Sequence, residues 1–121
     1  MNPPRARYPA LRLRTTWPAA HAVLITAQGA LDTATAGSLA ALLTDRLWAA
    51  PERLGIDLSE VDFLGVAGVR VLLHAALLAE QKGTDLVVET GTNPFVRRAL
   101  RVTDADRRLT VSTRRTEPAP A

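Results

Sequence analysis

Short apolar strand patterns alternate with amphipathic helical patterns along this chain, and this alternation limits the folds that the chain can adopt. The strand patterns lie at residues 11–14, 22–25, 54–58, 86–88 and 109–111. Residues 22–25 form a continuous apolar run, which predicts a central strand buried on both faces, and the short pattern at 109–111 predicts an edge strand. The first two strands have no helix between them, so they predict an antiparallel hairpin, whereas the later strands favour parallel pairing with crossover helices.

The helical patterns come with start and stop signals. Leucines recur at helical spacing over residues 39–47, after Thr35, a residue type that favours the N-cap position. A second apolar stripe over residues 69–76 is followed by Gly83, a typical C-terminal stop. Asn93-Pro94 predicts the start of a third helix, because Asn is a preferred N-cap and Pro suits the first helical position. That helix is expected to bury Phe95, Val96, Ala99 and Leu100.

The resulting element order is β-β-α-β-α-β-α-β, which predicts a single α/β domain with a mixed sheet of four to five strands flanked by helices. A chain of 121 residues has room for one core only. We place the domain at residues 10–112. The proline-rich ends, residues 1–9 and 113–121, cannot build a core and are expected to be disordered tails.

The distribution of charge argues against a nucleic-acid partner. The formal net charge is +3, yet residues 10–112 carry eleven basic and eleven acidic side chains, so the excess lies in the tails. A nucleic-acid-binding domain instead concentrates positive charge on one face or one helix. No apolar run approaches the roughly 18–20 residues of a membrane-spanning helix, and no signal-peptide pattern follows the N-terminus. We therefore expect a cytoplasmic domain with no nucleic-acid partner and no insertion into a membrane.

The residue types that support catalysis are scarce. The chain has no Cys and only two His, His21 and His74, which excludes thiolate chemistry and makes a metal site unconvincing. Neither glycine-rich phosphate-binding motif is present. No nucleophile has a neighbouring base to activate it. We expect no enzymatic activity, no cofactor and no bound metal.

One group of carboxylates supports an alternative. Asp57 ends a predicted parallel strand, where α/β folds place their sites, and Glu60 and Asp62 follow it closely. Together they would suit a Mg²⁺-binding, phosphoryl-accepting or nucleotide-binding domain that uses Asp57, as in a response-regulator receiver. Such a site also needs an acidic pair after an early strand and a late lysine. The early strands end without such a pair and the only lysine, Lys82, ends a helix, so solvated loop carboxylates are the favoured interpretation. The charge run over residues 104–108 likewise predicts a solvated turn.

Three other side chains have two interpretations each. Trp17 and Trp48 are expected to pack at strand and helix ends rather than to act as binding platforms. His74 lies away from the main apolar stripe of the second helix, with Val71 and Leu78 about one turn to either side. It is either a partly exposed helical histidine or, with Val71 and Leu78, part of a stripe that binds a partner.

Three segments, in order, resemble the STAS domain of anti-sigma factor antagonists. Residues 29–36, Gly-Ala-Leu-Asp-Thr-Ala-Thr-Ala, are similar to that family's G-x-L-D turn into its first helix. Residues 55–59, Gly-Ile-Asp-Leu-Ser, resemble its third strand. Residues 63–69, Phe-Leu-Gly-Val-Ala-Gly-Val, resemble the segment that leads into its second helix. The resemblance spans residues 11–111, and three motifs at the right intervals are fairly specific for the fold.

The resemblance implies a mixed sheet flanked by helices and a function in protein binding. Domains similar to this one bind an anti-sigma factor with a kinase-type ATP-binding fold and thereby release a sigma factor. That kinase phosphorylates a Ser within the family pattern apolar-Asp-Ser-[Ser/Thr/Ala]-Gly. Carried over to this chain, the Asp falls on Gly65, the Ser on Val66 and the Gly on Gly68, so the acceptor hydroxyl is missing.

Two functions remain open from the resemblance. The domain either binds its anti-sigma factor without being switched off by the kinase, or serves as a STAS accessory subunit of a membrane lipid transporter, another role within the family. The final helix of many relatives is also not expected, because no helical pattern follows Val111. By resemblance, the partner-binding residues are expected to be Leu31, Asp32, Thr33, Leu64, Gly65, Val66, Ala67, Gly68, Arg70 and His74.

Overall fold

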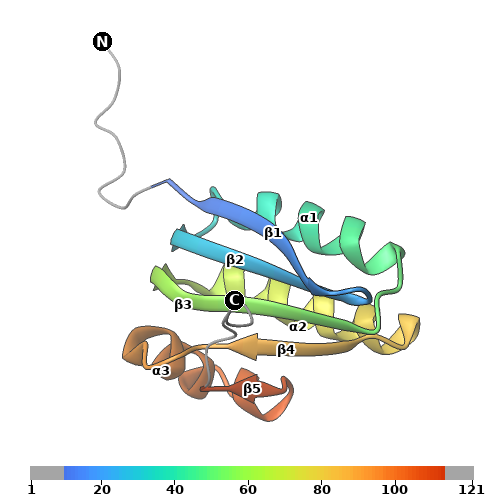
Figure 1. Cartoon of the computed structure of the whole chain (residues 1–121). Helices are drawn as coiled ribbons and strands as arrows, with labels where there is room; N and C mark the ends of the chain where they lie inside the picture. The colour runs from blue at the N-terminus through green and yellow to red at the C-terminus, as the bar shows by residue number, and fades with distance from the viewer. Residues whose placement is uncertain (1–9, 114–121) are drawn as a thin grey trace.

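The computed structural model describes residues 10–113, which form a five-stranded sheet with three α-helices (Figure 1). The strands are β1 (Arg12–Ala19), β2 (Ala22–Leu31), β3 (Arg53–Leu64), β4 (Asp85–Glu89) and β5 (Val111–Ser112). The helices are α1 (Ala36–Trp48), α2 (Val66–Lys82) and α3 (Pro94–Val102), with a short 3-10 turn at Ala105–Arg107. This order confirms the predicted one. The two predicted tails lie outside the described residues, apart from Thr113.

The sheet is mixed, as the sequence predicts. Its strands follow the chain order from β1 to β5, so each strand neighbours the next one along the sequence. The first pair, β1 and β2, is antiparallel, and every later pair is parallel. The last strand has only two residues and lies at the edge. An N-terminal hairpin followed by three crossovers is therefore the architecture of this domain.

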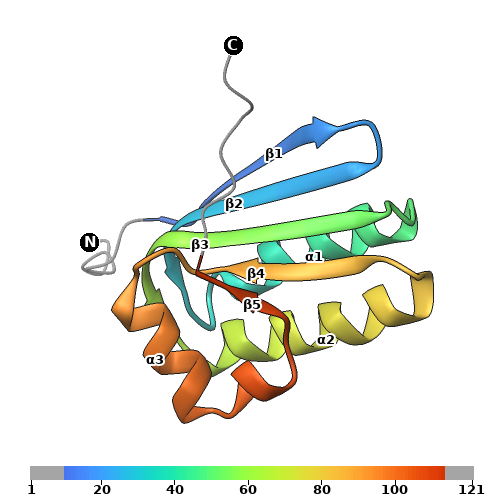
Figure 2. The same ribbon diagram turned by 60° about the horizontal axis from the view of Figure 1, so that its bottom comes forward.

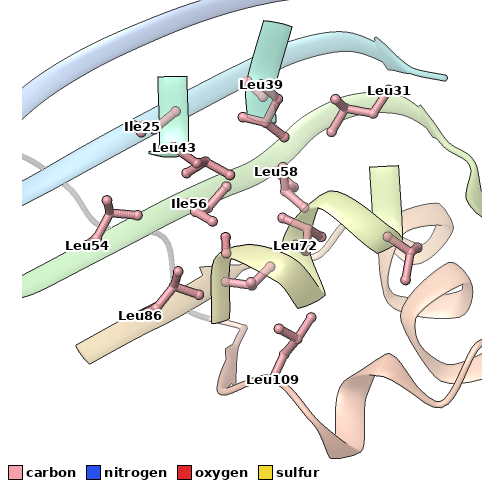
Figure 3. Packing of buried hydrophobic residues seen from close by; sticks show 14 of the residues in the cluster. Ile25, Leu31, Leu39, Leu43, Leu54, Ile56, Leu58, Leu72, Leu86 and Leu109 are labelled. Atoms are coloured by element: carbon pink, nitrogen blue, oxygen red, sulfur yellow. The ribbon is translucent and has the colours of Figure 1, made fainter. Parts of the chain in front are cut away.

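All three helices lie on the same side of the sheet in Figure 2, with α1 and α2 beneath it and α3 near the end where β3 and β4 finish. Ile25 and Ile56 are register partners on this side of the sheet, and both side chains are fully buried. They join Leu43 from α1 and Leu72 from α2 in one apolar cluster (Figure 3). Each such side chain contributes about 1.5–3 kcal/mol through its removal from water.

The opposite face of the sheet is not covered by a helix within residues 10–113. Side chains alternate along β2, so Val23 and Ile25 are buried while Leu24 and Thr26 are only half-buried. The prediction of a strand buried on both faces was therefore wrong, because the helices pack against one face only and the other face is half-buried. This domain has two layers.

The helix ends follow most of the predicted signals. Gly83 ends α2 in the left-handed conformation, with a φ of 72°, and its amide donates to the carbonyl oxygen of Glu80. Trp17 and Trp48 lie near the ends of β1 and α1, as predicted, but both rings are largely exposed and pack against cations rather than the core. The ammonium group of Lys82 lies over the ring of Trp48, 3.5 Å from the ring centroid, in a cation–π contact. No helix among residues 10–113 has the length and apolar character needed to cross a bilayer.

Candidate partner-binding surface

Two connecting turns meet where β2 and β3 end. Leu31 and Leu64 are register partners at the last position of the β2–β3 pair. The amide of Gly65 then donates a hydrogen bond of 2.9 Å to the carbonyl oxygen of Leu31. This bond joins the turn that leads into α1 to the turn that leads into α2. The segments predicted from the sequence, residues 31–33 and 64–68, are thus brought together.

The turn before α1 is built around Asp32. Its Oδ1 accepts hydrogen bonds from the amides of Ala34 and Thr35, at 2.9 and 3.0 Å. The hydroxyl of Thr35 donates to the carbonyl oxygen of Ala30 and accepts from the amide of Asp32. Thr35 is the N-cap residue of α1, but its side chain makes no capping bond to the helix. The predicted N-cap position of Thr35 is therefore confirmed, but its hydroxyl is used within the turn rather than for a bond to the helix.

The second turn is very short. Leu64 still belongs to β3 and Val66 already begins α2, so residues 63–69 lead directly into this helix, as the resemblance implies. Gly65 alone connects them, in an extended conformation that suits an N-cap and without a side chain to bond the first amides of the helix. Val66 follows with 62% of its surface exposed. Val66, which the family resemblance aligns with a phosphorylatable serine, is therefore accessible and apolar.

Gly68 allows α2 to approach β2 closely. A Cβ atom at this position would lie 2.8 Å from Cδ1 of Leu64, which would have to shift, and 3.1 Å from Cβ of Leu31, which is tighter than most carbon contacts. A glycine here therefore permits the first turn of α2 to rest against the end of β2. Leu31, Leu64 and Gly68 are buried, so they shape the predicted surface without offering a side chain to a partner.

The exposed members of the predicted surface follow one side of α2. Val66, Arg70 and His74 are spaced four residues apart, and all three are exposed. Val71 and Leu78 are half-buried and pack against the core cluster. The predicted alternative stripe of Val71, His74 and Leu78 is thus divided, because His74 shares its exposed side with Arg70. Thr33 is exposed, and Asp32 and Ala67 are half-buried at the same end of the domain.

Sequence reasoning missed one aromatic residue at this end. The third helix was expected to bury Phe95, but this side chain is 70% exposed, whereas Val96 and Leu100 enter the core. Asn93 explains the placement, since its side chain accepts from the amides of Phe95 and Val96 and donates to the carbonyl oxygen of Ser59 at 3.0 Å. This contact holds the first turn of α3 beside β3.

The alternative acidic site is not formed. Asp57 lies within β3 rather than at its end, is 2% exposed, and is in register with Glu89 of β4. Glu60 is exposed and accepts a hydrogen bond from the side chain of Gln28, and Asp62 is also exposed. Among residues 10–113, no group of three acidic, His or Cys side chains is placed to hold a metal ion. The prediction of solvated loop carboxylates was wrong for Asp57, because β3 continues well beyond it.

The family of the chain follows from a comparison with known proteins. The family model described as "Mlab, STAS domain" matches residues 16–112. The chain belongs to the STAS family. The motifs quoted from the sequence and the order of strands and helices agree with this assignment. No curated protein sequence matches this STAS domain.

Solved structures share the fold of this STAS domain. An anti-sigma factor antagonist from Mycobacterium paratuberculosis superposes with a TM-score of 0.76 at 25% identity, over 87% of each chain. The anti-sigma factor antagonist SpoIIAA in its unphosphorylated form gives a TM-score of 0.71 at 16% identity, over 84% of this chain and 89% of SpoIIAA. The phosphorylated form of SpoIIAA, described as a Bacillus cell fate determinant, gives 0.65 at 14% identity, over 84% of this chain and 92% of SpoIIAA.

Proposed function

We propose that this STAS domain is an anti-sigma factor antagonist that acts in the cytoplasm by binding an anti-sigma factor with a kinase-type ATP-binding fold. Its role is binding rather than catalysis. The observation that carries the proposal is the hydrogen bond between Gly65 and Leu31, because it unites the two turns that the family resemblance assigns to the partner. The similar fold of a mycobacterial anti-sigma factor antagonist supports it.

The chemistry of the exposed residues suits a protein interface. Val66 offers an apolar side chain at the junction of the two turns, and Arg70 lies one helical turn further along α2. Interface centres are depleted in charge, whereas arginine is enriched among the residues that dominate binding energy. Arg70 also makes no ion pair within residues 10–113. We therefore assign the centre of the interface to Val66 and its anchor to Arg70.

Val66 also determines how the antagonist is controlled. A valine side chain has no oxygen, so no phosphoryl group can be attached where relatives have serine. SpoIIAA has been solved in phosphorylated and unphosphorylated forms. By contrast, the domain with Val66 stays in the binding state regardless of kinase activity at this position. We propose that it is a constitutive antagonist.

A second candidate function is that of an accessory subunit of a membrane lipid transporter. The lack of a hydroxyl group on Val66 favours this candidate too, since a subunit that only docks to its partner has no need of a phosphoryl acceptor at position 66. This candidate uses the same surface but a different partner. The identity of the partner therefore separates the two functions.

The deciding experiment is affinity purification of the tagged full chain from its own cells, followed by mass spectrometry. Specific recovery of an anti-sigma factor would support the first proposal, and recovery of transporter subunits would support the second. A matched sample carrying Val66→Asp should lose the true partner, because the charge lies at the centre of the surface. Arg14→Ala is a suitable control, since Arg14 is exposed on β1. If the Val66→Asp variant still recovered the same partner, the interface would have to lie on another part of the domain.

A further inference from the structure

One side of α2 carries a seam with the spacing of a coiled coil. Val66, Arg70, Leu73, Leu77 and Glu80 succeed one another at intervals of four, three, four and three residues. This average spacing of about 3.5 residues places side chains along the line where two helices pack. Within the seam, Leu77 is 60% exposed although it is a leucine near the middle of a long helix. We call these five residues the α2 seam.

The α2 seam borders an open groove. The groove has a volume of about 830 Å³ and lies between α2 and the edge of the sheet. Leu73 and Leu77 line it from the helix, and Leu86 and Val87 line it from β4. β5 pairs only with Val88 and Glu89, so it does not extend along this part of β4. Within residues 10–113, Leu77 is therefore left largely exposed beside this groove, which Arg53 and Arg108 also line.

The order of charges along the α2 seam is self-complementary. Arg70 and Glu80 lie five residues to either side of Ala75, and Leu73 and Leu77 lie two residues to either side of it. A second copy placed antiparallel, with its twofold axis level with Ala75, brings Arg70 opposite Glu80 of the partner subunit. The same axis brings Leu73 opposite Leu77 of the partner subunit. This reciprocity is the condition for a twofold interface, in which one patch binds itself.

We propose that a second copy of this chain docks along the α2 seam and the adjoining groove, forming an antiparallel dimer. Leu73 and Leu77 form its apolar centre, and two Arg70–Glu80 pairs flank that centre. Neither Arg70 nor Glu80 makes an ion pair within residues 10–113, so both are available for this contact. A single helix pair is a small interface, so the dimer dissociates on the order of micromolar concentrations or above.

The dimer has a consequence that rests on the proposed function. Arg70 belongs to both surfaces, and Val66 lies at one end of the α2 seam. An anti-sigma factor and a second copy therefore compete for the same side of α2. Self-association thus lowers the concentration of antagonist that can bind, without any phosphorylation.

The test is sedimentation velocity on the full chain alone, over a wide concentration range. The parent is expected to shift from 13.0 kDa towards twice that mass as concentration rises. Arg70→Glu and Glu80→Arg should each raise the dissociation constant about tenfold or more, because like charges then face each other. The double variant Arg70→Glu with Glu80→Arg should restore the parental constant. Arg14→Glu, on the exposed side of β1, should leave it unchanged.

The outcomes separate this proposal from the proposed function. A parent that stays monomeric at every concentration would overturn the dimer, as would single charge reversals that leave association intact. A double variant that does not recover association would overturn the antiparallel pairing. Because no anti-sigma factor is present, each of these results stands whether or not the chain binds one.

Discussion

The side-chain amide of Asn93 donates a hydrogen bond of 2.8 Å to the main-chain oxygen of Val61, and this contact ties the start of α3 to β3. The other end of the same amide group accepts from the first amides of α3. One side chain therefore both caps a helix and holds that helix against the sheet. The placement of the exposed Phe95 in the first turn of α3 depends on it.

Replacement of Asn93 by alanine should lower the free energy of unfolding by about 2 kcal/mol, because a helix cap and bonds to strand carbonyls are lost together. Urea denaturation followed by circular dichroism measures this change. Asn93→Ser is the matched control, since serine can still cap the helix but is too short to reach β3, and it should cost about half as much. Parental stability of Asn93→Ala would contradict the dual role.

Two glycines in helices should respond in opposite ways to alanine. Gly68→Ala should destabilise the domain by about 1 kcal/mol, because overpacking against Leu31 and Leu64 exceeds the gain in helix propensity. Gly37→Ala in α1 should stabilise it by about 0.5 kcal/mol, since a Cβ there meets nothing within 4 Å. Thermal and urea unfolding of the two variants provides the comparison. Equal effects at both positions would show that the close approach of α2 to β2 is not needed.

Val66→Asp should separate stability from binding. A carboxylate in the first turn of α2 faces the positive end of the helix dipole, so stability should be unchanged or rise by roughly 0.3–1 kcal/mol. Affinity for the anti-sigma factor should fall by about 2 kcal/mol or more, because the charge is desolvated against an apolar surface. Calorimetric titration and thermal unfolding measure the two effects.

Val66→Asn, which is polar but uncharged, is the control for that experiment, and it should bind more tightly than Val66→Asp. The parent is also incubated with the kinase and ATP, and no phosphate should be incorporated at position 66. Phosphorylation of the parent, or parental affinity in the Val66→Asp variant, would refute the proposal that this domain is a constitutive antagonist.

Arg70→Ala should weaken the complex with the anti-sigma factor by about 1–2 kcal/mol, since arginine often anchors protein interfaces. His74→Ala tests the next turn of the same side of α2. Both side chains are exposed, so circular dichroism should report an intact fold for each variant. Unchanged affinity in both variants, measured beside Arg14→Ala, would exclude this side of α2 as the interface.

Nucleic-acid binding should be weak and should collapse as salt rises. The basic and acidic side chains of residues 10–112 balance, so the net positive charge comes from the arginines outside this range. Few phosphates can therefore be neutralised. Fluorescence anisotropy with a labelled DNA duplex, measured over a range of salt concentrations, tests this expectation. Sequence-specific binding by residues 10–112 at physiological salt would overturn it.

Local signals in the sequence predicted the elements of this fold well. Gly83 and Asn93-Pro94 marked helix ends correctly, because capping depends on residues close in sequence. The length of β3 could not be predicted in this way. It pairs with β2 as far as Leu64, across two irregularities in register, and such pairing is set by a distant strand. The burial of Asp57 between Thr26 and Glu89 follows from that pairing.

The candidate surface was predictable only as a set of segments. Motif resemblance selected residues 31–33 and 64–68, but the bond from Gly65 to Leu31 that joins them depends on strand register. Phe95 shows a second limit. Phe95 and Ala99 form one helical stripe and Val96 and Leu100 another, and the core receives the second stripe most deeply. Hydrophobicity alone does not separate two adjacent stripes.

The exposure of Val66 has a consequence for how such domains evolve. Its side chain supports no part of the core, while the backbone around it is held by Gly65, Leu31 and Gly68. Mutations at position 66 therefore encounter little selection from folding. A single replacement at position 66 can therefore supply or remove a hydroxyl on this surface and leave the fold intact. Under the proposed function, the switch and the scaffold are then inherited as separable traits.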